Sequence, residues 1–271
     1  MLTIRPRRSW LPADPREIWL FRGLFLRLGV RDLTLRYRQT ALGVIWVVLQ
    51  PLLAAGILSF VFGTVAGLEG PAGIPYFVFS LTGMVAWTAF SQMLTRASGS
   101  LVGAIDMVQK VYFPRLLLPL STVLSTVVDV GVSLVMLGAS LAVTGIWAGP
   151  AILTLPVWLA LLIATGLGLG MLATALMVRF RDVQYILPVA TQLLLFATPV
   201  AYLVPVGAGF TTLILELNPL TGMFEGVRWA VLGTAAPSAW LAAYSVVAGV
   251  AALGVGLLVF TRMERAFADV I

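Results

Sequence analysis

The chain has 271 residues, 60% of them hydrophobic and 10% charged, and its mean hydropathy is +1.03. Soluble domains carry about 25% charged residues, so this composition excludes an ordinary soluble protein and predicts an all-α integral membrane protein. The formal net charge is +6, but the arginines stand between apolar runs, which indicates membrane topology and not a nucleic-acid partner. The sequence contains no cysteine and no histidine, so thiolate chemistry is excluded, the commonest general base is missing, and we expect no metal or cofactor.

Residues 1–39 form a basic arm that holds nine of the seventeen lysines and arginines. No short apolar region with a small-residue cleavage site follows its start, so we expect no removable signal peptide. One helical face carries Ile18, Phe21, Phe25 and Leu28. Because Arg16, Arg27 and Arg31 cluster opposite, the pattern predicts an amphipathic helix at the membrane surface. The alternative is an ordinary cytoplasmic arm that follows the positive-inside rule.

Residues 40–271 form the membrane domain, with six apolar segments of about the 20 residues that a helical crossing needs. These predicted spans are 41–66, 76–95, 116–144, 152–178, 184–203 and 239–261. Six crossings place both termini on one side. That side collects sixteen of the seventeen basic residues and is therefore assigned to the cytoplasm, whereas only Arg228 lies opposite.

The loop 98–115 is the only substantial polar interruption deep inside the chain. Read as one helix, it places four residues on a single stripe: Leu101, Ile105, Val108 and Tyr112. Asp106 and Lys110 lie roughly opposite and form an i,i+4 pair, and the helix ends before Pro114. A short amphipathic helix in this position has the form of a docking element. Its stripe contacts a partner or packs on the adjoining spans.

Asp129 is the one carboxylate in the middle of a predicted span. An acid at this depth is a functional candidate. Thr122, Thr126 and Ser133 share its helical face, however, and such a polar stripe also serves helix packing. We favour packing, because no basic or acidic partner is expected at a similar depth.

Aromatic residues gather at the ends of the spans, where interfacial belts explain most of them. Trp46 and Phe196 are exceptions because they lie inside predicted spans. Such rings either belong to the belts or line a path and stack on the apolar face of a sugar.

Residues 206–233 are apolar, but Asn218-Pro219 divides them into two pieces that are each too short to cross a bilayer. The charged residues of this segment are Glu216, Glu225 and Arg228, and the last two are spaced i,i+3. Two half-helices predict a re-entrant hairpin that acts as an external gate. The alternative is a helical hairpin that rests on the external surface.

The sequence lacks the residues that several classes of function require. No G-x-x-x-x-G-K-[ST] loop is present, so the chain has no such phosphate cradle of its own. A membrane enzyme requires convergent acid, base or metal-binding groups near one face, and the sequence shows none. A secondary transporter requires paired ionisable residues in the spans or an internal repeat, and Asp129 alone gives it little support.

Several motifs together resemble the ABC-2 permeases that export bacterial polysaccharides, which include O-antigen, teichoic acid and capsule exporters. In chain order they are RDLTLRYRQTALGVIWVVLQPLL, MVQKVYFPRLLLPLS, VRFRDVQYILP, NPLTGMFEGVRW and MERAFADVI. They run from Arg31 to Ile271, and the first thirty residues match only in type.

The resemblance implies a homodimer of six-span subunits with two copies of a separate ATPase, which binds ATP and Mg²⁺. It implies that the stretch from Ile105 to Tyr112 is a coupling helix, and that Arg181 and Asp182 belong to a second ATPase contact. The first and fifth spans then line the path, which favours Trp46, Phe196 and Tyr202 as lining residues. The expected cargo is an undecaprenyl-linked polysaccharide, of O-antigen type, that crosses the bacterial inner membrane. The alternatives are a teichoic acid or capsule exporter, or a secondary transporter.

Overall fold

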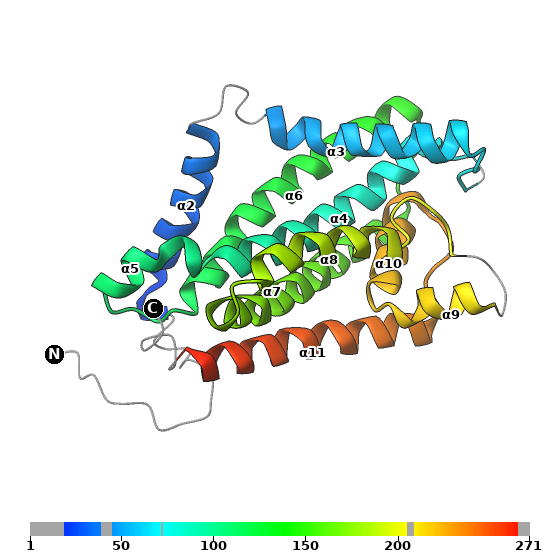
Figure 1. The fold of residues 1–271 in the computed structure, drawn as a ribbon. Coiled ribbons are helices and arrows are strands. Elements are labelled where there is room, and N and C mark those ends of the chain that lie inside the picture. The colour runs from blue at the N-terminus through cyan, green and yellow to red at the C-terminus, as the bar shows by residue number, and fades with distance from the viewer. Residues whose placement is uncertain (1–18, 39–44, 72, 205–208, 265–271) are drawn as a thin grey trace.

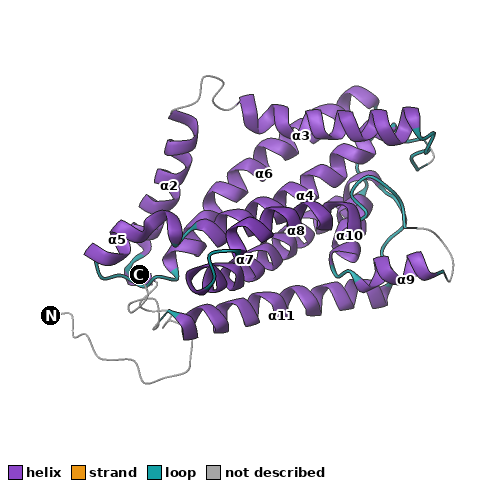
Figure 2. Ribbon diagram, viewed as in Figure 1, coloured by secondary structure: helices purple, strands orange, loops and turns teal. Residues whose placement is uncertain are grey.

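The computed structural model describes residues 19–38, 45–71, 73–204 and 209–264. Every regular element in these ranges is a helix (Figure 2), which confirms the predicted all-α class. Parts of three predicted regions lie outside the described residues: 1–18 and 39 of the arm, 41–44 of the first span and 206–208 of the gate hairpin. In chain order the elements are α2 (Arg22–Arg38), α3 (Ile45–Leu58), η1 (Ser59–Val65), α4 (Tyr76–Gly99), η2 (Val102–Ala104), α5 (Ile105–Lys110), α6 (Leu117–Thr144), η3 (Pro150–Thr154), α7 (Leu155–Arg179), α8 (Val183–Ala197), α9 (Phe210–Leu217), α10 (Leu220–Leu232) and α11 (Ala239–Met263).

Five helical segments are long and apolar enough to cross a membrane. They are Ile45–Val65, Tyr76–Gly99, Leu117–Thr144, Pro150–Arg179 and Ala239–Met263. Each coincides with a predicted span to within four residues at either end. The first of them joins α3 directly to the π-helix η1. The chain is therefore a multi-pass membrane protein.

The predicted fifth span is shorter than expected. It was predicted to reach Leu203, but α8 ends at Ala197 after fifteen residues. At about 1.5 Å per residue it is about 22 Å long, less than the roughly 30 Å of a hydrocarbon core. Thr198 takes up extended backbone because Pro199 follows it and disfavours the helical conformation. The 184–203 boundary was therefore wrong.

Helix α4 forms the centre of the bundle, between α3 on one side and α7 on the other (Figure 1). It also packs against α6 and α10. In its most apolar stretch 78% of the residues are buried within the chain, against 17% for α3 and η1 together. Among the membrane-length helices α4 is thus the most enclosed, and the others have outer faces that the chain leaves uncovered.

The closest helix crossing joins α7 and α11. A Cβ atom built on Gly256 would lie 2.0 Å from the carbonyl oxygen of Gly168, and one built on Gly168 would lie 2.4 Å from that of Ala252. Only glycine allows two backbones to approach so closely, which is the usual role of small residues between membrane helices.

One end of the bundle gathers the basic segments of the chain. Helix α2 runs across the direction of the long helices (Figure 1) and packs against α6. Phe21, just before α2, and Phe25 and Leu28 within it join one apolar cluster with Leu101 and Phe113. Arg27 and Arg31, which were predicted to lie on the opposite face of this helix, are exposed. Ile18 and Arg16 lie outside the described residues. We call this the basic end and the opposite one the α9 end.

A polar contact closes the basic end. The backbone N–H of Arg115 donates to Oε1 of Glu264 at 3.1 Å, and Nη1 of Arg115 donates to the backbone oxygen of Glu264 at 2.9 Å. The segment after α5 is therefore fixed to the residue that follows α11.

Candidate functional site

The loop 98–115 is not the single helix that the sequence predicts. Helix α4 continues to Gly99, a 3-10 turn follows at η2, and α5 has only six residues. Val111 has extended backbone, with φ −134° and ψ 134°. The backbone leaves the helical conformation at Ala104, with φ −126° and ψ 18°, between η2 and α5. The Asp106–Lys110 pair falls within α5, where it favours the short helix.

The predicted stripe is consequently divided between two environments. Leu101 has no exposed surface and belongs to the apolar cluster of the basic end. Ile105 and Val108 are half-buried, and Val108 packs against the same cluster. Tyr112 is 66% exposed and lies beyond the end of α5. The accessible surface at α5 thus includes Asp106, Gln109 and Lys110 of the helix itself, with Val102 before it and Val111 and Tyr112 after it.

The second predicted contact lies beside the first. Arg181 is exposed and lines a cavity of about 570 Å³ together with Leu101 and Ile105. Asp182 is also exposed, and its backbone oxygen accepts hydrogen bonds from the N–H groups of Tyr185 and Ile186 in the first turn of α8. The two loops that were predicted to contact one partner therefore lie together at the basic end.

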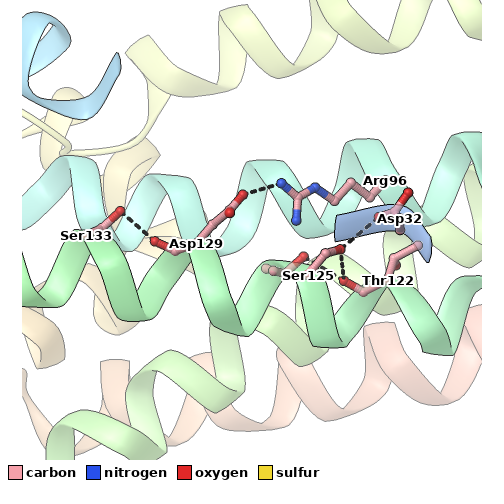
Figure 3. Close-up of polar contacts among 7 residues, drawn as sticks. Asp32, Arg96, Thr122, Ser125, Asp129 and Ser133 are labelled. Atoms are coloured by element: carbon pink, nitrogen blue, oxygen red, sulfur yellow. Dashed lines mark hydrogen bonds and ion pairs between the residues drawn. The ribbon is translucent and has the colours of Figure 1, made fainter. Parts of the chain in front are cut away.

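Asp129 has a basic partner, contrary to the sequence-based expectation. Its carboxylate accepts a hydrogen bond from Nη2 of Arg96 and forms an ion pair with it (Figure 3). Arg96 was assigned to the loop after the second span, but it belongs to the last turn of α4 and points toward α6. The side chain of Asp129 is 2% exposed and that of Arg96 is 13% exposed. This pair is a buried charge pair between two helices.

Two serines of α6, one on either side of Asp129, make further polar contacts, and one of them reaches α2. The hydroxyl of Ser133 donates to the backbone oxygen of Asp129 at 2.9 Å, and that of Ser125 donates to the Asp32 carboxylate at 2.9 Å (Figure 3). Thr122 and Thr126 bond to carbonyls of α6 itself. The predicted packing stripe is thus present, but it carries an ion pair that the sequence interpretation did not include.

The hairpin at the α9 end has the predicted break. Helices α9 and α10 meet at Asn218-Pro219. Nδ2 of Asn218 donates to the oxygen of Ala197 at 3.1 Å and to Oγ1 of Thr198 at 2.9 Å. The turn between the two helices is therefore attached to the end of α8.

The two halves of the hairpin differ in burial. Helix α10 packs against α4, α7 and α11 and buries most of its residues. Helix α9 exposes Phe210, Leu213 and Leu217, and Glu216 is also exposed. A hairpin lying wholly on the surface does not fit this packing, since α10 is enclosed by three other helices.

Arg228 is the charged residue at the core of this end. It is 2% exposed, and its guanidinium lies 4.0 Å from the ring centre of Phe79. Nη2 donates to the oxygen of Val200 at 2.7 Å, and Nη1 donates to that of Tyr202 at 3.1 Å. The predicted i,i+3 partner, Glu225, is only half-buried. Burial raises the pKa of the Glu225 carboxyl, and the charge of Arg228 opposes this shift.

Arg228 and Asn218 together hold the non-helical segment 198–203, which consists mostly of turns and bends, and Tyr76 of α4 adds a third contact by donating to the oxygen of Ala201. Sequence reasoning missed this role of Arg228, and it missed Tyr76 altogether. Pro199 is the signal that was available, because a segment that cannot remain helical needs other partners for its carbonyl groups.

The predicted path aromatics do not form one group. Phe196 and Tyr202 line a small cavity with Leu58 and Phe62, and the hydroxyl of Tyr202 donates to the oxygen of Phe196 at 2.8 Å. Trp46 is twelve residues before Leu58 on α3, which is about 18 Å along a helix. Two of the three aromatics are therefore together, and the third lies toward the other end of α3.

Among the described residues no group of three acidic, cysteine or histidine side chains is arranged to hold a metal ion. The chemistry that the described residues offer is hydrogen bonding, charge pairing and apolar contact.

Comparisons with known proteins agree with this architecture. A sequence model described as ABC-2 type transporter matches residues 23–232. The O-antigen export system permease protein RfbA of Myxococcus xanthus is 30% identical over 240 residues, which cover 86% of this chain and 90% of that protein. A protein of the same name from Klebsiella pneumoniae is 27% identical over 253 residues, covering 89% and 92%. The polysialic acid transport protein KpsM of Escherichia coli is 26% identical over 211 residues, covering 76% and 80%. The chain belongs to the ABC-2 type transporter family, as its motifs predict.

Proposed function

We propose that this protein is the membrane subunit of an ABC transporter that exports a lipid-linked polysaccharide, of O-antigen type, across the bacterial cytoplasmic membrane. The family match, which spans most of the chain, is the observation that carries this function. The names of its relatives support the cargo, since they include O-antigen export permeases and a polysialic acid transporter. The lipid carrier of the cargo is undecaprenyl.

The membrane topology in this proposal has six crossings. Helix α8 crosses together with the non-helical segment 198–203 that follows it, which supplies the length that fifteen helical residues lack. The basic end faces the cytoplasm by the positive-inside rule, and both termini lie there. Helix α2 lies along the membrane surface. Its orientation across the long helices supports this position, as do exposed apolar residues such as Leu26 and Val30 (Figure 1).

A separate ATPase drives the cycle from the basic end, and two copies of it serve a homodimer of this chain. The accessible face of α5, with Asp106, Lys110 and Tyr112, and the neighbouring Arg181 and Asp182 form its contact. Ile105 and Val108 transmit the movement to the bundle, because they lie between that face and the apolar cluster. ATP must favour one arrangement of the helices, since a ligand that binds two states equally shifts neither.

The exit lies at the α9 end, where α9 and α10 act as an external gate. Glu216, Asn218, Pro219, Glu225 and Arg228 belong to this gate. The bonds from Asn218 and Arg228 to the end of α8 support a mechanical link between the gate and the wall of the path. Phe196 and Tyr202 face the path beside this link, and Trp46 faces it nearer the basic end.

Secondary transport is the alternative that the Arg96–Asp129 pair favours, because it supplies the paired ionisable residues that the sequence analysis did not find. The two functions are distinguished by the energy source. Uptake or export by this chain alone in proteoliposomes, driven by a proton gradient, supports the alternative.

The proposed function is tested by deleting the gene in its host and by expressing the chain together with the ATPase encoded beside it. We expect surface polysaccharide to disappear on deletion, and we expect the chain to co-purify with the ATPase. Tyr112→Asp should abolish co-purification, whereas Val255→Asn, on the exposed side of α11, should not. Unchanged surface polysaccharide after deletion, or no association with any ATPase, contradicts the proposal.

A further inference from the structure

The loop between α4 and α6, which carries the proposed ATPase contact, is fixed to the bundle at both of its ends. Just before its start, the hydroxyl of Thr174 on α7 donates to the oxygen of Ala97 at 2.7 Å. At its end, Arg115 makes the two hydrogen bonds to Glu264 that close the basic end. The loop is therefore attached to α7 on one side and to the end of α11 on the other.

The two helices that hold the loop are themselves in backbone contact. Helices α7 and α11 pack extensively against each other, and Gly168 meets Gly256 without a side chain between them. Phe260, near the end of α11, has no exposed surface. It lies in the apolar cluster of the basic end with Phe113 of the loop and Met171 of α7. The α7–α11 pair is therefore one packed unit, and both ends of the loop are attached to it.

Helix α7 also leads into the second proposed ATPase contact. The exposed Arg181 and Asp182 follow its end after one residue, Phe180. The N–H of Phe180 donates to a carbonyl in the last turn of α7 at 2.7 Å, so the chain stays fixed to the helix as it leaves it. Both proposed contacts thus belong to the same packed unit, one by continuity of the chain and the other through Glu264.

The place that Glu264 occupies favours a carboxylate. Arg115 lies one residue before Leu116, the N-cap of α6. The first N–H groups of a helix have no partner within it, and the helix dipole favours negative charge at this end. Leucine offers no side-chain acceptor, and the first turn of α6 contains no acidic residue. Glu264, 149 residues further along the chain, supplies the acceptor and the negative charge.

At the other end of the molecule, α11 contacts the hairpin of α9 and α10. The hydroxyl of Tyr244 donates to the oxygen of Leu217, the last residue of α9, at 2.8 Å. A Cβ atom built on Gly222, in α10, would lie 2.8 Å from the oxygen of Leu241 in α11. Tyr244 and Glu264 are about 30 Å apart along a helix, and α11 runs the length of the bundle (Figure 1). One helix therefore connects the end of the loop to the hairpin.

We propose that Glu264 is a positioning residue that transmits the movement of α5 to the α7–α11 pair, and through α11 to the hairpin of α9 and α10. The inference rests on the proposed function and assigns the side chain that couples its ATPase contact to the rest of the chain. Ile105 and Val108 transmit movement by apolar contact, which has no preferred direction. The bonds between Arg115 and Glu264 are directional and fix the end of the loop in one position.

Three variants of the full chain, each expressed with the ATPase, test this role. Glu264→Ala removes the acceptor, whereas Glu264→Gln keeps a side-chain oxygen that can accept from the N–H of Arg115. Thr261→Ala is the matched control, because this hydroxyl lies one turn earlier and bonds to carbonyls of α11 itself. The measurement is the amount of glycan exported per ATP hydrolysed, in proteoliposomes that contain the natural or the variant complex.

We expect glycan export per ATP to fall several-fold in Glu264→Ala and to stay near the natural value in Glu264→Gln and Thr261→Ala. All three variants should co-purify with the ATPase, since none alters the exposed face of α5. A purely structural role would lower the amount of complex and leave this ratio unchanged. An unchanged ratio in Glu264→Ala, or an equal loss in Glu264→Gln, overturns the assignment.

Hydrogen exchange of the purified chain, without the ATPase, gives a second readout and decides the case if Glu264→Ala does not assemble. We expect the amides of residues 111–116 to exchange several-fold faster in Glu264→Ala and at the natural rate in Thr261→Ala. Unchanged exchange at Arg115 overturns the assignment, and so does faster exchange throughout the bundle.

The two levels of inference fail differently. Absence of export by the natural complex defeats the proposed function. Export by the natural complex, combined with an unchanged ratio in Glu264→Ala, defeats only the role of Glu264.

Discussion

Helices α4 and α8 line one cavity of about 360 Å³, yet the chain treats them in opposite ways. Helix α4 has apolar residues enclosed by neighbouring helices, whereas α8 has no buried residue and exposes Tyr185, Val189 and Leu193. Most of the packing of α4 is therefore made within one chain, and most of the surface of α8 is left for what lies outside the chain.

The difference has a physical basis in the sequence of each helix. In α4, residues such as Phe79, Phe90 and Met93 face neighbours on all sides but one. In α8, Pro188 within the helix and Pro199 after it limit both regularity and length. Bonds from Asn218 and Arg228 then fix the end of α8 to the gate hairpin. Movement of the gate and movement of α8 are expected to occur together.

The largest effect is expected where α4 contacts α6. Asp129→Asn leaves the guanidinium of Arg96 buried without its charge partner, and breaking a buried pair in this way costs about 3–5 kcal/mol. The double variant Arg96→Met with Asp129→Asn should recover much of that loss. Unfolding of the purified protein in detergent measures all three variants. Additive destabilisation in the double variant would contradict a direct interaction between the two side chains.

The same substitution, phenylalanine to alanine, in α4 and in α8 gives the sharpest comparison of the two helices. Phe90→Ala, at a position with no exposed surface, should lower the free energy of unfolding by about 3–5 kcal/mol. Phe196→Ala, at a position 58% exposed, should change it by no more than about 0.5 kcal/mol. Comparable losses for the two variants in the monomeric chain would show that α8 is packed as firmly as α4.

The attachment of the hairpin α9–α10 to the segment that follows α8 should weaken when Arg228 is replaced. Arg228→Met removes two hydrogen bonds from a charged donor, each worth about 1.5–3 kcal/mol, and we expect a loss of roughly 3 kcal/mol. Arg228→Lys, which keeps the charge, should retain part of that stability. Hydrogen exchange of residues 198–203 should rise in the methionine variant. Unchanged protection of this segment would mean that Tyr76 and Asn218 suffice to hold it.

The smallest effect on folding is expected on the outer side of α8. Leu193→Ser should leave the free energy of unfolding of the single chain within about 0.5 kcal/mol, because the residue is 67% exposed. If α8 completes its packing against a second copy, the variant should nevertheless weaken self-association, measured by mass photometry in nanodiscs. A dimer of unchanged stability would assign this face to lipid.

The sequence was sufficient for the features that depend on local pattern. Apolar length predicted five spans to within a few residues, and Asn218-Pro219 predicted the break between α9 and α10. It failed where the outcome depended on contacts between distant segments. Arg96 looked like a loop residue because apolar composition ends before it, although the helix continues and an acid 33 residues later receives its charge.

Another miss concerns the loop after α4. The stripe from Leu101 to Tyr112 assumed an unbroken helix, but the backbone leaves the helical conformation at Ala104 and again at Val111. Leu101 is buried in an apolar cluster built from segments far apart in the sequence, whereas Tyr112 is exposed, and sequence periodicity alone does not contain that division.

Proteoliposomes that contain this chain, its ATPase partner and a lipid-linked glycan give the most direct test of polysaccharide export. The measurement is the ATP-dependent appearance of glycan on the membrane face opposite the ATPase, followed with an impermeant glycosidase. We predict ATP-dependent transfer by the natural chain and none by Tyr112→Asp, which should not associate with the ATPase. Transfer that proceeds without ATP, or no transfer by an intact complex, would contradict polysaccharide export by this protein.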